Sequence, residues 1–163
     1  MKTHLLFGIH CHQPVDNFDH VVHEIIEKSY EPFFKTLEQF PDFKCSVHFS
    51  GWLLEFIYQH RPCLFKRIQS LSEQLEFFTG GFYEPILASI SKANRIAQIK
   101  MLSQFIQKHF KQTPQGLWLT ERIWDDSIID DLHECGIKYV VVDDYHLIAS
   151  GHDASNLNGY FLT

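Results

Sequence analysis

The stretch that decides the fold reads Gly116-Leu-Trp-Leu-Thr-Glu-Arg-Ile-Trp-Asp125. It begins as an apolar run that suits a buried strand, and it continues as a carboxylate, a guanidinium and a second tryptophan. Asp125 and the two polar residues after it can cap a following helix. Glu121 is therefore predicted to lie at the carboxyl end of a strand, in a strand-to-helix loop, where α/β folds bind ligands. A surface ion pair between Glu121 and Arg122 would explain the same residues without a site.

The order of strand, polar motif and helix recurs along the chain. Strands are expected at residues 4–10, 43–49, 75–79, 117–121 and 138–142, and a sixth is expected to begin at residues 159–162. Apolar residues at helical spacing predict helices between them, and the first of these runs over residues 18–37 with a bend near Pro32. This alternation indicates an α/β fold of parallel strands joined by helical crossovers. Residues 140–142 are all valine, so this strand is expected to be buried on both faces.

Polar side chains follow four of the five complete strands. They are His10 and His12 after the first, Glu84 after the third, Glu121 after the fourth, and Asp143, Asp144 and His146 after the fifth. The carboxyl ends of parallel strands meet at one edge of a sheet, and residues scattered by chance would not all fall there. We therefore expect these side chains to form one active site.

Three kinds of function fit these residues. The first is carboxylate chemistry on a sugar, with Glu121 as the nucleophile or acid. The second is metal-dependent hydrolysis, with Zn²⁺ ligands taken from His10, His12, Asp143, Asp144 and His146. The third is a carbohydrate-binding protein that uses the same cleft without catalysis. In the sequence Glu121 lies between Trp118 and Trp124, whose flat rings suit stacking on a sugar. A metal site does not need such rings, so the two tryptophans favour carboxylate chemistry on a sugar.

Composition narrows the class of protein further. The net charge of −6 argues against a nucleic-acid surface, and no apolar run approaches the roughly 20 residues of a membrane span. The N-terminus reaches His10 too soon for a signal peptide. The four cysteines form no CxxC pair, so they are interpreted as free thiols of a cytoplasmic protein. No linker divides residues 1–163, which are expected to form one unit.

Four motifs together resemble glycoside hydrolase family 57, and chiefly its 4-α-glucanotransferase and α-amylase members. The motifs are His-Cys-His-Gln-Pro at residues 10–14, Gly-Phe-Tyr-Glu-Pro at 81–85, Trp-Leu-Thr-Glu-Arg-Ile-Trp at 118–124 and Val-Asp-Asp-Tyr-His at 142–146. The first motif alone is a weak signal, but the four in this order and spacing are specific. The resemblance covers essentially the whole chain.

The resemblance implies a barrel of seven strands, cleavage with retention of configuration, and no metal or other cofactor. It implies an α-glucan substrate such as starch, glycogen or maltooligosaccharides, and it makes Glu121 the nucleophile. The residues matched to the donor sugar subsite are His10, His12, Glu84, Trp118 and Arg122. Gln13, Trp124 and Asp144 complete the candidate substrate-binding residues, and no residue is assigned to a metal.

Length separates this chain from the family. Family members have several hundred residues, and their general acid/base is an Asp in the second half of the barrel. Residues 1–163 are therefore expected to be the N-terminal part of the barrel, as a fragment or a truncated product, with impaired activity. Glu84 is the nearest replacement acid by motif. An unpaired strand at residues 159–162 would favour self-association through the open barrel edge.

Overall fold

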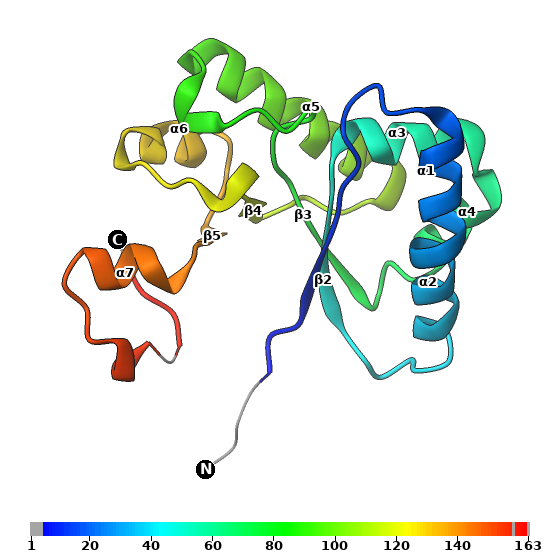
Figure 1. Ribbon diagram of the computed structural model, residues 1–163, viewed down its shortest axis with the longest axis horizontal. Helices are drawn as coiled ribbons and strands as arrows, with labels where there is room; N and C mark the ends of the chain where they lie inside the picture. Colours follow the sequence, from blue (N-terminus) through cyan, green and yellow to red (C-terminus); the bar gives the residue numbers. More distant parts are fainter. Residues whose placement is uncertain (1–4, 158, 163) are drawn as a thin grey trace.

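The computed structural model describes residues 5–157 and 159–162, and the predicted start of the first strand at His4 lies outside them. Its strands are β1 (Gly8–Cys11), β2 (Cys45–Phe49), β3 (Leu75–Phe78), β4 (Gly116–Trp118) and β5 (Tyr139–Val141). All pairs are parallel, in the order β1-β2-β3 and β4-β5, and a bridge between Thr79 and Leu117 joins the two groups (Figure 1). The strands therefore follow one another in space as they do in sequence.

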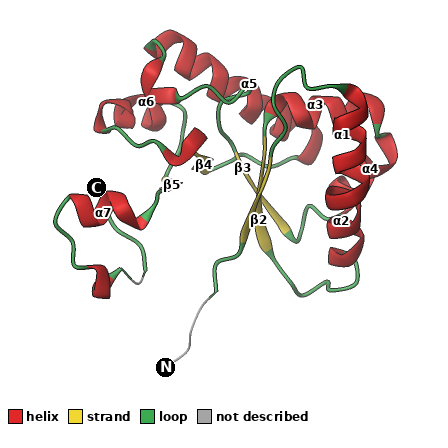
Figure 2. Cartoon of the chain, viewed as in Figure 1, coloured by secondary structure: helices red, strands yellow, loops and turns green. Residues whose placement is uncertain are grey.

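Helices connect the successive strands. The longer ones are α1 (Asp19–Ile25), α2 (Glu31–Leu37), α3 (Gly51–His60), α4 (Pro62–Ser70), α5 (Lys92–Phe110), α6 (Ile129–Glu134) and α7 (Asp144–Ala149). A π-helical turn, η1 (Ile26–Tyr30), joins α1 to α2, and short 3₁₀ turns are η2 (Leu87–Ser89), η3 (Thr120–Arg122), η4 (Asp126–Ile128) and η5 (Ala154–Asn156). Figure 2 shows α1–α4 gathered beside β1–β3, with α6 and α7 on the opposite side of the view. None of the helices in the described part of the chain is long and apolar enough to cross a membrane.

The segment predicted as one bent helix is nearly continuous from α1 through α2. Its irregular turn lies just before Pro32, where the N–H of Glu31 donates to the carbonyl of Ile26, five residues back. Proline has no N–H to donate inside a helix, so the chain takes up the irregularity in the preceding turn. Helices α3 and α5 begin at serine N-caps: Ser50 and Ser91 accept hydrogen bonds from N–H groups three residues later.

Two apolar clusters form the core. The larger one lies between the β1–β3 sheet and helices α1–α5, and its fully buried side chains include Val22, Ile26, Phe34, Val47, Leu53, Leu54, Ile57 and Ile68. The smaller one packs under β4 and β5 and consists of Leu87, Ile99, Leu117, Leu119, Ile128, Leu132 and Ile137. These clusters hold the carboxyl ends of the strands in place.

Three expectations about strands were wrong. The fourth strand ends at Trp118 rather than at Glu121, because residues 120–122 form the turn η3. The fifth strand is not buried on both faces: Tyr139 and Val141 are each 39% exposed, since β5 is the last strand of the described sheet and only its other face packs on the smaller cluster. Residues 159–162 form no strand, and the chain enters helix α7 directly after β5.

Candidate functional site

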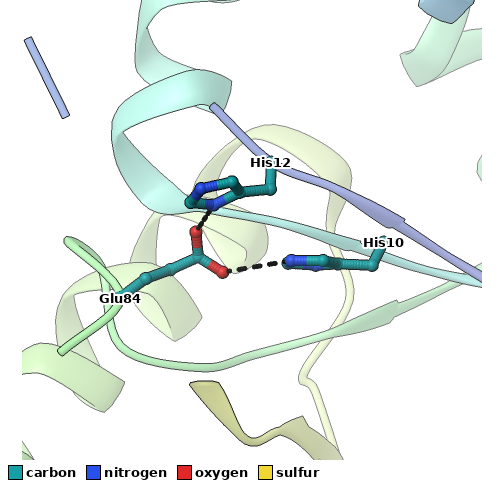
Figure 3. A group of neighbouring side chains, drawn as sticks. All are labelled: His10, His12 and Glu84. Carbon is teal, nitrogen blue, oxygen red and sulfur yellow. Dashed lines mark hydrogen bonds and ion pairs between the residues drawn. The ribbon is translucent and has the colours of Figure 1, made fainter. Parts of the chain in front are cut away.

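The centre of the site is a carboxylate held between two histidines. Glu84 lies in the loop after β3 and reaches toward the end of β1, as Figure 3 shows. Its Oε2 bonds to Nδ1 of His12, and its Oε1 lies 3.6 Å from Nε2 of His10. The Glu84 side chain is only 6% exposed. Parallel topology therefore brings Glu84 to two histidines that precede it by 72 or more positions in the sequence.

A tight turn aims Glu84 into the site. The N–H of Glu84 donates to the carbonyl of Gly81 over 3.0 Å, and Glu84 has a positive φ of 51°. A Cβ on Gly81 would lie 2.6 Å from Cδ of Pro85, so only glycine fits there. The N–H of Tyr83 donates to Oε1 of Gln98 on helix α5, which ties the turn to the core. The glycine motif thus serves to position the carboxylate.

Three nearly parallel aromatic rings lie beside the carboxylate. The ring of His10 stacks on Trp118 at 4.6 Å between centroids and lies edge to edge with His48 at 5.0 Å. Nδ1 of His10 also lies 2.8 Å from Nδ1 of His48, a hydrogen-bond distance. His48 is 1% exposed and was missed in the sequence, where it stands among the buried residues of β2. Its register opposite His10 could have revealed it, since neighbouring parallel strands place these side chains on the same face.

Burial sets the protonation of this group. It lowers the pKa of His10 to about 4, assisted by the neighbouring His12 and Arg122, and it lowers the pKa of His48 well below the ordinary value. Burial also raises the pKa of Glu84, and the charge of Glu121 raises it further, while His12 opposes both. Near neutral pH the His10–His48 pair is uncharged. Glu121 is thus close enough to Glu84 for its charge to act on that carboxyl group.

Glu121 occupies an unusual backbone position. Both Glu121 and Arg122 have φ of 53°, and their turn is closed by N–H donation from Arg122 to the carbonyl of Leu119 over 2.9 Å. Side chains rarely adopt this left-handed region, which costs on the order of 1–3 kcal/mol for each residue. Such strain is typical of active sites, where it aims a side chain that regular structure would direct elsewhere.

Arg122 does not pair with Glu121, so the simple surface-pair interpretation was wrong. Its Nε lies 2.7 Å from Oδ1 of Asp143, and its carbonyl lies 3.0 Å from Nε2 of His146. Within residues 5–157 and 159–162 no ion pair includes Glu121. The residues after β5 therefore brace the Glu121 turn through its neighbour Arg122.

The remaining candidate residues lie around this centre. Gln13 approaches the hydroxyl of Tyr30, which donates to the carbonyl of His12 over 2.8 Å. Gln13 thus lies next to the bond that secures His12. Trp124 directs its indole N–H to Asp126 and packs against the smaller core cluster. Asp144 is exposed at the first turn of α7.

One group of side chains has the spacing of a metal site. Ligand atoms of His10, His12 and Glu84 all lie within 4.8 Å of one another. In the described part of the chain, no such group includes Asp143, Asp144 or His146, so that part of the expected zinc set was wrong. These three residues instead lie at and after the end of β5, where two of them contact Arg122.

Comparisons with known proteins agree with this geometry. The model of glycosyl hydrolase family 57 matches residues 6–163. Alpha-amylase 1 of Dictyoglomus thermophilum is 45% identical over 157 residues, which are 95% of this chain and 23% of that protein. The crystal structure of 4-alpha-glucanotransferase from Thermococcus litoralis superposes with a TM-score of 0.90 at 46% identity, covering 93% of this chain and 24% of the other.

A more distant structure tests the fold alone. The GH57-type branching enzyme of Pyrococcus horikoshii superposes with a TM-score of 0.76 at 18% identity, covering 93% of this chain and 43% of the other. These likenesses and the parallel sheet confirm the predicted α/β fold as part of a (β/α)7 barrel. The chain spans about a quarter of the length of the curated relatives that it matches.

Proposed function

Since the chain belongs to glycosyl hydrolase family 57, we propose that it carries the nucleophile of a retaining enzyme that acts on α-glucans. The relatives named as an α-amylase and a 4-alpha-glucanotransferase support this substrate class. Glycosyl transfer to a second sugar and hydrolysis by water share the same first step. The proposal therefore covers both outcomes.

The observation that carries the proposal is the position of Glu121. Its strained turn follows a strand end, its carboxylate has no ion-pair partner in the described part of the chain, and its charge acts on the buried Glu84. A nucleophilic carboxylate must be ionised and accessible, and Glu121 is exposed. Glu84, by contrast, is held between histidines and suits the binding of a sugar hydroxyl.

The first chemical step follows from this arrangement. A Glu121 oxygen attacks the anomeric carbon, the bond from that carbon to the leaving oxygen breaks, and a general acid supplies the proton to the leaving group. Water or another sugar hydroxyl then attacks the same carbon, loses its proton to the conjugate base and releases Glu121. Trp118 supplies a flat surface beside His10, and Arg122 supplies positive charge near Glu121. His10, His12, Gln13 and Glu84 would hold the sugar from the β1 side, and Trp124 and Asp144 from the side of α6 and α7.

The test uses a sugar whose leaving group needs no proton. Incubation with α-glucosyl fluoride should attach one hexose to the peptide that contains residues 118–125, as seen by mass spectrometry. Glu121→Gln should abolish the label. Glu73→Gln, an exposed glutamate in the turn before β3, is the matched control and should label like the parent chain. Amylose has a poor leaving group. It should react at least about 10²-fold more slowly than α-glucosyl fluoride if residues 1–163 do not supply the general acid.

Two results would overturn the assignment. A hexose on Glu84 or Asp143 would identify a different nucleophile. A folded chain that binds maltooligosaccharides but never labels would leave carbohydrate binding without catalysis as the better description.

Metal-dependent hydrolysis is the second candidate, because His10, His12 and Glu84 have ligand spacing. Elemental analysis of the purified chain separates it from the first. We expect no stoichiometric zinc. Near-equimolar zinc that is lost in His12→Ala would favour the metal-dependent reaction.

A further inference from the structure

We infer that His48 is a positioning residue that keeps the proton of His10 on Nε2. His10 then offers a hydrogen-bond donor to the site in place of a lone pair. The tautomer rests on geometry alone, and its consequence for a sugar rests on the proposed function.

The first step is the contact between the two histidines. Their Nδ1 atoms lie 2.8 Å apart, so one nitrogen must donate and the other must accept. Two donors or two acceptors could not approach so closely. The protonation of one Nδ1 therefore fixes that of the other, and the two tautomers are coupled.

The second step is the far nitrogen of His48. Its Nε2 is buried and has no hydrogen-bond partner in the described part of the chain. The backbone of Gly80 closes over it, so closely that a Cβ there would lie 2.7 Å from Nε2. Orphaned buried N–H groups are rarer than unpaired acceptors. His48 therefore carries its proton on Nδ1 and donates it to His10.

The third step follows for His10. Because its Nδ1 accepts from His48, its own proton lies on Nε2. That nitrogen is 3.6 Å from Oε1 of Glu84, beyond ordinary hydrogen-bond length, so its proton remains available to a bound oxygen. A sugar hydroxyl placed there could accept from His10 and donate to Glu84. Together the two residues offer one donor and one acceptor to the same hydroxyl group.

The same tautomer opposes metal binding. A metal ion needs the lone pair of His10 Nε2, since His12 and Glu84 supply the other two ligands. Providing it would require both rings to switch tautomers and would bury an N–H of His48 under Gly80 without an acceptor. His48 thus makes a trio with ligand spacing a poor metal site.

The direct test is the tautomer itself. Two-bond ¹⁵N–¹H spectra of the uniformly labelled chain at pH 7 should show His10 protonated on Nε2 and His48 on Nδ1, with signals assigned by His10→Gln and His48→Leu. The opposite pair of tautomers would overturn the inference. This measurement needs no activity, so its failure is distinct from a failure of Glu121 to label.

Two variants test the consequence. His48→Asp places an acceptor-only group beside His10 Nδ1 and should move the proton of His10 from Nε2 to Nδ1. The affinity of the His48→Asp chain for Zn²⁺, measured by calorimetry with zinc alone, should be about 10–100-fold higher than that of the parent chain. This is the range known for residues that hydrogen-bond metal-bound histidines. His48→Leu lacks the acceptor and should gain less. Adding His12→Ala should remove the gain. An unchanged tautomer, or equal zinc affinity in a folded His48→Asp chain, would refute the role of His48.

Discussion

Replacing Gly80 by alanine should destabilise the 163-residue chain by about 1–2 kcal/mol. The added Cβ would lie 2.7 Å from Nε2 of His48 and 3.1 Å from the carbonyl of Trp118. His48 cannot easily move aside, because it is buried and bonded to His10. Overpacking of this kind costs about 1–3 kcal/mol. Alanine recovers about 0.4–1 kcal/mol of that cost by restricting the unfolded chain, and the difference is the net loss of about 1–2 kcal/mol.

A double-mutant cycle in urea measures the contact. Gly80→Ala should cost clearly less in a His48→Ala background, because the atom that it meets has been removed, and the coupling should be about 1 kcal/mol. Gly8→Ala is the matched control, since a Cβ there meets its nearest atoms at an ordinary 3.6 Å. Equal costs in the two backgrounds would show that Gly80 does not press on His48. If Gly80→Ala leaves the free energy of unfolding unchanged, Gly80 does not pack closely against His48 Nε2, and the tautomer inferred from that packing is refuted.

Three further predictions concern the surroundings of the site. His10 has a folded pKa of about 4, below its unfolded value of 6.5, so its contribution to stability is complete above pH 6.5 and is lost as the pH falls toward 4. After allowance for its partial exposure this loss is about 1–2 kcal/mol. His48 also has a lowered pKa and adds a loss of the same sign, so urea midpoints should fall less with acid in His10→Gln than in the parent chain. Tyr30→Phe removes the bond to the carbonyl of His12 and should cost about 1 kcal/mol, or a melting temperature lower by about 2–4 °C; an unchanged melt would contradict the role of that bond. Tyr139 and Val141 are each 39% exposed on one face of the sheet, so light scattering should detect association or a dye should bind apolar surface; a monomer without dye binding would count against an open face.

Local patterns in the sequence were enough for the order of elements. Ser50, Pro62 and Ser91 stand at helix starts in the structure, and such signals can be read locally because capping and proline geometry act within one turn of the chain. Regular alternation then implied parallel strands, and parallel strands place their carboxyl ends together. The meeting of His10, His12 and Glu84 was therefore predictable, although their distances were not.

Burial of strands depended on their neighbours. The valines of residues 140–142 are equally apolar, yet Val141 is exposed and Val140 packs on the smaller core cluster. Residues 159–162 have β-forming side chains, but they form no strand, and none lies beside them among the residues that the structure describes. Composition cannot reveal whether a segment will find a partner, because the backbone hydrogen bonds of a strand belong to two segments.

The sequence by itself determined the α/β class, the chain order of the motifs and the set of side chains at the strand ends. Only the tertiary structure decided how they are used: Arg122 pairs with Asp143, 21 residues away, and His48 meets His10, 38 residues away. The strained turn at Glu121 likewise has no signal in its own residues. Hydrogen bonds and strain of this kind depend on which distant groups the fold places within about 3 Å, and no local pattern carries that distance.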